Sequence, residues 1–321
     1  MSEREAVVIG AGVSGLTSAL RLMEDGWRVR VWAADPPERT MSAVAAAIWY
    51  PYRVGPVDLV RAWGERSFAV FEALAADPGT GVRMALGTEL LALGGDPAAV
   101  PGWAAHIADF RVAGELEMPP GRAGWVGWTF PVPVVDTSVY LGWLAGRLQR
   151  AGGTMEIRRA ASLAEAAEAA PLVVNCSGLG ARELAGDDAL RPVRGQVVRV
   201  ENPGLTRFWI DDRNPDGLTY LVPRRGDCIL GGTDEEGETD TTPDEAVGEA
   251  IRRRCVALEP ALAGARVLEH RVGLRPWRPE IRLEAEALPG GARVIHNYGH
   301  GGAGVTLSWG CAERVAELAN G

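Results

Sequence analysis

The sequence contains no lysine, so all 33 of its basic residues are arginines. Any site that binds a carboxylate or a phosphate must therefore use arginine side chains or backbone groups. Aspartate and glutamate together number 42, and the formal net charge is −9. A chain with this charge repels polyphosphates, which argues against a nucleic acid as a partner.

Cysteine, histidine and long apolar runs are also scarce. Four scattered cysteines without metal-ligand spacing are typical of a reduced, cytoplasmic protein, although a bridge between Cys228 and Cys255 stays open. The four histidines form no metal-binding or catalytic-triad pattern, so we expect no metal. No segment reaches the ~20 apolar residues of a membrane helix, and no export signal precedes the first strand. We therefore expect no membrane partner.

Length and composition indicate a globular protein. The chain has 321 residues, of which 47% are hydrophobic and 23% are charged. This is enough apolar material for a sizeable core, and domains usually contain about 100–200 residues. Two domains are the simplest prediction.

The first 35 residues have the pattern of a β-α-β unit. An apolar strand at 6–9 leads into Gly10, Gly12 and Gly15, and a helical pattern follows. Glycines with this spacing let the backbone approach a dinucleotide pyrophosphate at a helix N-terminus. Asp35, after the second strand, either accepts hydrogen bonds from the adenosine ribose or only begins a turn, and both interpretations stay open. The motif fits NAD as well as FAD.

Helix and strand patterns continue along the chain. Helices are predicted at 58–75, from Asp136 to Arg150, after a capping box at Ser162, from the segment 242–245 onward, and at the C-terminus. Strands are predicted at 27–35, 172–176, 196–200, 208–210, 220–222, 228–230 and 293–295, with a turn at 224–227. A glycine cluster at 299–304 precedes the last helix.

Five stretches, in order along the chain, resemble motifs of D-amino-acid oxidases. They are AAAIWYPY (45–52), VRGQV (193–197), YLVP with GGT (220–223 and 231–233), GLRPWRP with IRLE (273–279 and 281–284), and HNYGHGGAGVT (296–306). The last two are highly specific. By this resemblance the sequence is identified as a member of the D-amino-acid oxidase family, with FAD as its non-covalent cofactor.

The resemblance implies a mixed α/β fold class with two interleaved domains. A Rossmann-like parallel-sheet domain that binds FAD would comprise residues 1–55, 135–190 and 268–321. An antiparallel-sheet substrate domain would comprise residues 56–134 and 191–267. The family is often dimeric, so a homodimer is possible.

Four residues are expected at the substrate. By resemblance, Arg275 binds the substrate α-carboxylate, for which its planar fork of donors is suited. Tyr220 would donate its hydroxyl to the same carboxylate, Gly302 would offer its carbonyl to the substrate ammonium, and Tyr50 would line the side-chain pocket. The alternatives are a structural ion pair for Arg275 and a core position for Tyr220. No residue is expected to act as an essential acid or base.

The cofactor residues come from the same resemblance, and the helix after the glycine cluster would direct its amides at the flavin. The family often has glycine where Ala47 stands, and Asp35 lies one position beyond the usual ribose carboxylate. The residues expected along FAD are Gly10, Ala11, Gly12, Val13, Ser14, Gly15, Asp35, Met41, Ser42, Ala46, Ala47, Ile48, Ala160, Ser177, Gly178, Arg275, Arg282, Gly301, Gly302, Ala303, Gly304, Val305 and Thr306.

The implied reaction is oxidative deamination of D-amino acids by hydride transfer to flavin N5. Its products are 2-oxo acids, ammonia and, with O2 as acceptor, hydrogen peroxide. D-Aspartate oxidases tend to have arginine directly after Gly-Gly-Thr, where this chain has Asp234. We therefore expect substrates without an acidic side chain, apolar or basic, and we find no counterpart of the family's second, lid tyrosine.

Other functions stay open. They are a D-aspartate oxidase, a glycine oxidase-like flavoenzyme, a catalytically silent flavoprotein and, remotely, an NAD-dependent dehydrogenase.

Overall fold

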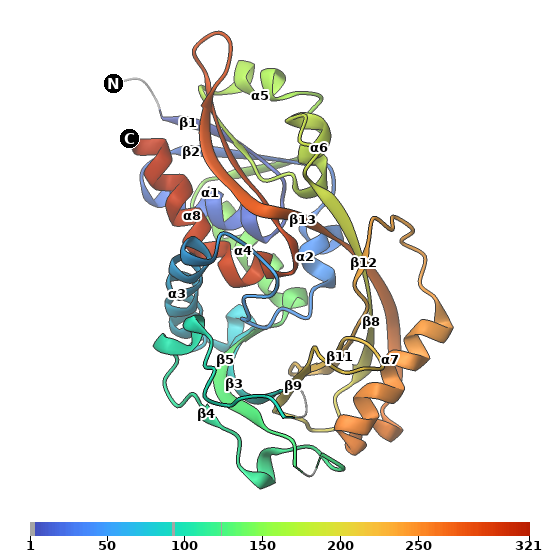
Figure 1. Cartoon of the computed structure of the whole chain (residues 1–321). Helices are drawn as coiled ribbons and strands as arrows, with labels where there is room; N and C mark the ends of the chain where they lie inside the picture. Colours follow the sequence, from blue (N-terminus) through green and yellow to red (C-terminus); the bar gives the residue numbers. More distant parts are fainter. Residues whose placement is uncertain (1–3, 92–93, 123) are drawn as a thin grey trace.

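The computed structural model describes residues 4–91, 94–122 and 124–321. In this part of the chain the strands form one 14-stranded sheet with the order β4-β5-β3-β9-β10-β11-β8-β13-β14-β7-β1-β2-β6, and β12 pairs with β8 off this path. One end of the sheet is parallel and the rest is mainly antiparallel, which confirms the mixed α/β fold class (Figure 1).

The parallel end contains the dinucleotide motif. Its strands are β1 (Glu5–Ile9), β2 (Arg28–Ala33), β6 (Thr154–Ile157), β7 (Leu172–Asn175) and β14 (Arg293–His300). Because helices cover both faces, the strands are apolar at consecutive positions, and Val7 and Val8 are both fully buried. Val8 packs with α1 (Val13–Glu24), α4 (Thr137–Arg150) and α8 (Gly304–Asn320), whereas Val7 packs with α5 (Leu163–Ala169).

The antiparallel part lies at the other end of the molecule (Figure 1). Its strands are β3 (Val82–Leu90), β4 (Arg111–Val112), β5 (Gly127–Val135), β8 (Arg191–Glu201), β9 (Phe208–Asp211), β10 (Thr219–Pro223), β11 (Asp227–Gly231) and β12 (Glu235–Glu236). The 21-residue strand β13 (Val267–Ala287) pairs with β8 on one side and β14 on the other, and so joins the two parts of the sheet. The proposed division into two domains falls along this continuous sheet and stays a prediction.

The remaining helices are α2 (Met41–Val44), α3 (Val57–Leu74), α6 (Ala181–Leu184) and α7 (Glu245–Leu258). Short 3-10 turns lie at Pro37–Arg39, Pro78–Thr80, Gly102–His106, Glu115–Glu117, Gly178–Gly180, Pro260–Gly264 and Gly301–Ala303. No helix in the described ranges has the length and apolarity needed to cross a membrane.

Some sequence expectations need correction. The helix expected to begin at the segment 242–245 begins only at Glu245, because the Asp244 side chain caps it by accepting hydrogen bonds from the backbone N–H groups of Ala246 and Val247. Cys228 and Cys255 are buried free thiols, so the bridge between them does not form. Strands β8 and β14 are longer than predicted, and β13 had no strand prediction.

Helices α3 and α8 cross at Gly310. The Gly310 N–H donates a hydrogen bond of 2.9 Å to the Ser67 hydroxyl, and a Cβ atom on Gly310 would lie 2.2 Å from the carbonyl oxygen of Trp63. The two backbones therefore touch, which a side chain at position 310 would prevent. This crossing fixes α8, whose first residue, Gly304, faces the site described below.

We predict that Gly310→Ala destabilises the protein by about 1–3 kcal/mol, because the added methyl group forces the two helices apart. The matched control is Gly142→Ala in α4, where a Cβ has no atom within 4 Å. That change should stabilise the protein by about 0.5–1 kcal/mol, because alanine has the higher helix propensity. Urea unfolding of both variants is the measurement, and equal effects would contradict the close crossing.

Candidate active site

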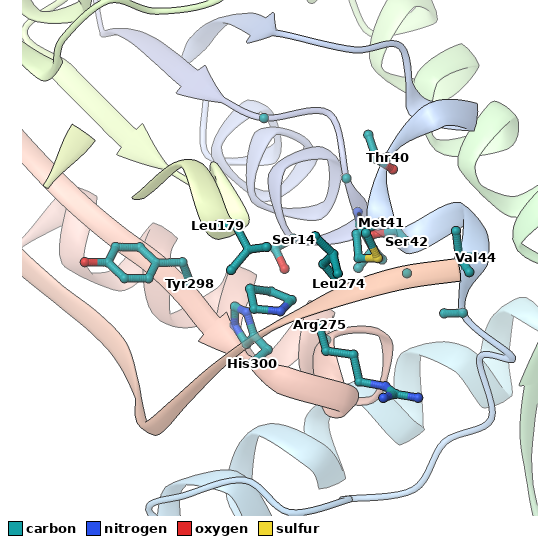
Figure 2. A pocket seen from close by; sticks show the side chains of 18 of the residues that line it. Ser14, Thr40, Met41, Ser42, Val44, Leu179, Leu274, Arg275, Tyr298 and His300 are labelled. Atoms are coloured by element: carbon teal, nitrogen blue, oxygen red, sulfur yellow. Dashed lines mark hydrogen bonds between the residues drawn. The ribbon is translucent and has the colours of Figure 1, made fainter. Parts of the chain in front are cut away.

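A cavity of about 690 Å³ extends from the glycine loop after β1 to the antiparallel strands. It is lined at one end by Gly10 to Ser14 and by Ser177 and Gly178, which follow β1 and β7. Residues from β13, the loop before α8, strand β10 and the segment around α2 are among those that line the rest. In Figure 2 Ser14, Met41, Ser42 and Leu179 are among the lining side chains drawn, and the Arg275 side chain extends away from them.

The structure brings most of the predicted site residues to this one cavity. Those that line it are Gly10, Ala11, Gly12, Val13, Ser14, Asp35, Met41, Ser42, Ala46, Ala47, Ile48, Tyr50, Ala160, Ser177, Gly178, Tyr220, Arg275, Gly301, Gly302, Gly304 and Val305. These residues come from segments far apart in the sequence, and folding of the chain brings them together. Four predicted residues are not among the lining: Gly15, Arg282, Ala303 and Thr306.

The four residues outside the lining have other neighbours. Gly15 packs against the glycine turn, since a Cβ on it would lie 1.9 Å from the carbonyl oxygen of Gly10. Arg282 donates to the Glu284 and Glu286 carboxylates and to the hydroxyl of Tyr298, and of these three partners Tyr298 lines the cavity. Ala303 is buried. The Thr306 hydroxyl binds the backbone N–H and C=O of Tyr50.

The glycine end of the cavity has the features of an anion site. Gly12 is the N-cap of α1 and supplies no side chain, and the Val13 N–H donates to the Ser42 hydroxyl over 3.0 Å. Gly10 has a φ of +111°, and a Cβ there would lie 2.4 Å from the carbonyl oxygen of Cys176. Apart from the Val13 N–H, which Ser42 binds, no side chain at the N-cap position covers the helix N-terminus, so it can face a negatively charged group. Asp35 lies in the turn after β2 and also lines the cavity. It can therefore both begin this turn and accept hydrogen bonds from a ribose in the cavity.

A second helix N-terminus meets the cavity at Gly304. Helix α8 begins there without a side-chain cap, directly after the turn Gly301–Ala303. Ala47 lines the same region with a φ of +56°, a left-handed conformation that L side chains rarely adopt. This explains why glycine is the more usual residue at that position.

Arg275 extends from β13 into the cavity. Its guanidinium lies against Gly195 of β8, where a Cβ would be 2.4 Å away, and its Nη1 donates to the Thr233 carbonyl oxygen over 3.1 Å. The Asp234 carboxylate is 3.5 Å from the same nitrogen. Arg275 therefore has the acidic neighbour that the alternative interpretation expected, and it lines the cavity as well. The side chain is 19% exposed, so the charge is largely desolvated.

Tyr220 lies beside Arg275. Its ring packs on Gly231 of β11, where a Cβ would be 1.9 Å from the ring. Burial raises the pKa of the Tyr220 hydroxyl, while the neighbouring Arg275 charge acts in the opposite direction. The Tyr220 hydroxyl thus keeps its proton and could donate it to a ligand beside Arg275. Because Tyr220 also lines the cavity, it is more than a core residue.

Three residues near this end were missed by the sequence analysis. Tyr52 and Asp212 line the cavity, and the Tyr52 hydroxyl donates to Asp234 over 3.2 Å. Glu89 accepts a 2.8 Å hydrogen bond from the Tyr50 hydroxyl. The usable signal for Asp212 was its position directly after a short apolar strand; nothing in the sequence pointed to Glu89.

Buried titratable groups surround the cavity. Burial, helped by the charge of Asp212, raises the pKa of Glu89 to about 7, although the Tyr50 hydrogen bond and Arg213 act against the rise. Burial lowers the pKa of His300 to about 4, so this imidazole is neutral at ordinary pH. Among the described residues no cluster of histidine, cysteine and acidic side chains could hold a metal ion.

A glycine-lined cavity that runs from two helix N-termini to a partly buried arginine is typical of dinucleotide-dependent enzymes. The family model described as FAD dependent oxidoreductase matches residues 5–318. The chain belongs to this family of FAD-dependent enzymes.

The relatives agree with this membership. A D-amino-acid oxidase of Rubrobacter xylanophilus is 59% identical over 314 residues, which cover 98% of this chain and 95% of that protein. A D-amino-acid oxidase of Streptomyces coelicolor is 53% identical over 319 residues, which cover 98% and 97%. Among solved structures, glycine oxidase from Bacillus cereus has a TM-score of 0.77 at 20% identity, with 99% and 95% of the chains covered, a likeness of fold.

We predict that Glu89 makes stability depend on pH. The folded protein keeps the Glu89 proton up to about pH 7, whereas the unfolded chain loses it near pH 4.5. The folded state binds more protons in this interval, so its stability falls as pH rises from 4.5 to 7, by about 3 kcal/mol at most. Urea unfolding across this range should show the fall in the wild type and a shallower one in Glu89→Gln; parallel curves would disprove it.

Proposed function

We propose that the protein binds FAD non-covalently and oxidises the Cα–N bond of D-amino acids that lack an acidic side chain. The single observation that carries this proposal is the partly buried Arg275 fork in the same cavity as the glycine loop. An arginine in such a position fits a substrate carboxylate close to a bound dinucleotide.

The residues present fit FAD. Side chains at Gly10 and Gly15 would collide with backbone carbonyl oxygens, so the tight turn that a pyrophosphate would approach requires glycine, and the N-terminus of α1, which has no N-cap side chain, would face its charge. Ser177, Gly178, Asp35 and Ala160 would then lie along the adenosine half. The N-terminus of α8 would face the flavin, where a positive dipole end stabilises negative charge on the reduced ring.

The substrate would be oriented by three contacts. Arg275 and Tyr220 would hold the α-carboxylate, the Gly302 carbonyl would accept a hydrogen bond from the amine, and the side chain would extend along Ile210 toward Tyr50. Because the carboxylate, the amine and the side chain would each be held in a fixed direction, only one enantiomer would direct its Cα hydrogen toward the flavin.

The chain then needs no acid or base of its own. FAD, when bound, would supply the redox chemistry, with the Cα hydride as the electron pair removed and O2 as the acceptor that takes up two electrons and two protons to give hydrogen peroxide. The imino acid left behind hydrolyses to a 2-oxo acid and ammonia. A homodimer and a cytoplasmic location stay predictions.

We predict that the purified, desalted protein is yellow and that D-alanine or D-valine bleaches it under anaerobic conditions, whereas the L-enantiomers do not. The measurement is the flavin absorbance before and after each addition, followed by peroxide detection when air is admitted. A colourless protein would favour the dehydrogenase, and a yellow one that ignores D-amino acids would be catalytically silent. A clear preference for D-aspartate would overturn the expected substrate range.

We predict that Arg275→Lys lowers kcat/KM for D-valine by roughly a hundredfold or more, because an ammonium group cannot hold a carboxylate by two parallel hydrogen bonds. The flavin absorbance should persist. Arg314→Lys, which alters an exposed arginine paired with Glu317 on α8, is the matched control and should have wild-type kinetics. Unchanged turnover by Arg275→Lys would place the carboxylate site elsewhere.

A further inference from the structure

We propose that Asp212 and Glu89 form an anionic subsite at the end of the cavity beyond Tyr220, and that it selects D-amino acids with a cationic side chain such as guanidinium. This inference rests on the proposed function and names the substrate class for the same site.

The position of the subsite follows from the strand registers. Glu89 of β3 lies opposite Ile210 of β9, and Ile210 lies opposite Tyr220 of β10. Residues directly opposite one another share a face of the sheet, so the three side chains form one row. Neighbouring strands are about 4.8 Å apart, which places Glu89 about 10 Å beyond Tyr220. The row thus extends from the arginine end of the cavity to a buried carboxyl group.

Asp212 brings a second carboxylate to this place. It lies two residues after Ile210 and lines the cavity, as Ile210 does. Its Oδ1 atom is buried and has no hydrogen-bond partner among the described residues. The nearest guanidinium, that of Arg213, is 4.0 Å away and 60% exposed. The carboxylate therefore has one solvent-exposed ion-pair partner at 4.0 Å and no hydrogen-bonded counter-ion among the described residues.

Glu89 is the independent observation that points to a ligand. Its side chain is only 5% exposed, and its Oε2 atom is buried with no partner among the described residues. Its Oε1 atom is bound by the Tyr50 hydroxyl, and Tyr50 lines the cavity. Leaving a buried polar atom unpaired is costly, so a donor arriving next to Tyr50 would relieve that cost.

The space between the two ends suits a long cationic side chain. Ile210 and Leu218 line the cavity and offer apolar surface to a methylene stem. Asp212 also lines the cavity, and Glu89, which is not among the lining residues, is connected to it through the hydroxyl of Tyr50. The neighbouring charges are those of Asp212 and Arg213 from the loop after β9, and Tyr50 is the titratable group from the opposite side. A cation there would favour ionised Glu89, whose pKa is otherwise raised to about 7 by burial.

The test compares D-arginine with D-citrulline, which has nearly the same shape but no charge, on the FAD-loaded protein. We expect kcat/KM for D-arginine to exceed that for D-citrulline by roughly tenfold to a hundredfold, the effect of one hydrogen bond to a charged group. Equal values would overturn the subsite while D-alanine oxidation still supports the proposed function. If no D-amino acid is oxidised, the proposed function itself fails.

Two variants assign the preference to these residues. Asp212→Asn and Glu89→Gln should each lower the ratio of the two kcat/KM values toward one, and the exposed Glu115→Gln should leave it at the wild-type value. Because Glu89 is buried, flavin absorbance and thermal unfolding would verify that its variant is folded, and Asp212→Asn tests the subsite independently. A ratio that neither variant changes would overturn the proposal.

The pH dependence adds a readout that a purely structural role would not move. The ratio for the wild type should rise as pH increases through about 7, because Glu89 loses its proton there. The substrate α-amine titrates alike in both compounds and cancels in the ratio. The rise should be absent from Glu89→Gln, and a rise that persists in this variant would contradict the role of Glu89.

Discussion

The guanidinium of Arg275 is the interaction on which the site depends. A charge that is four-fifths buried must be compensated, and among the described residues the protein supplies the Thr233 carbonyl at 3.1 Å, the Asp234 carboxylate at 3.5 Å and a hydrogen bond with the Tyr220 side chain. Much of the donor fork is left for a ligand that carries its own negative charge. Strand β13 holds this group where the parallel and antiparallel parts of the sheet meet, so a dinucleotide and an acid substrate would lie in one cavity.

Backbone atoms determine the space that is available to the Arg275 guanidinium. Gly195 lies under the guanidinium and Gly231 under the Tyr220 ring, and a methyl group at either position would overlap them. At the other end, Gly10 and Gly15 bring the first turn against β7 and against itself. The crossing of α3 and α8 at Gly310 then keeps the N-terminus of α8 on the cavity. Close packing of the backbone thus fixes the positions of Arg275, Tyr220 and the two helix N-termini.

The local elements of this structure, and most of the residues that line the cavity, could be predicted from the sequence. Glycine spacing, caps and apolar strands predicted β1, α1, α3 and β7, because each depends on neighbours in sequence. Non-local contacts were missed. Arg282 binds the Tyr298 hydroxyl on β14, a contact that only the pairing of β13 with β14 creates, and Glu89 reaches Tyr50 only through strand order. Strand β13 was missed because two prolines interrupt its pattern and its pairing with β8 is long-range.

The central claim is that Arg275 holds a carboxylate beside the flavin. The most direct measurement is the absorbance difference spectrum of the FAD-loaded protein titrated with benzoate, a carboxylate that cannot be oxidised, and with benzamide, its uncharged counterpart. The account predicts a saturable perturbation of the flavin bands by benzoate and none by benzamide at the same concentrations. Equal responses to the two compounds, or no response to benzoate, would contradict it.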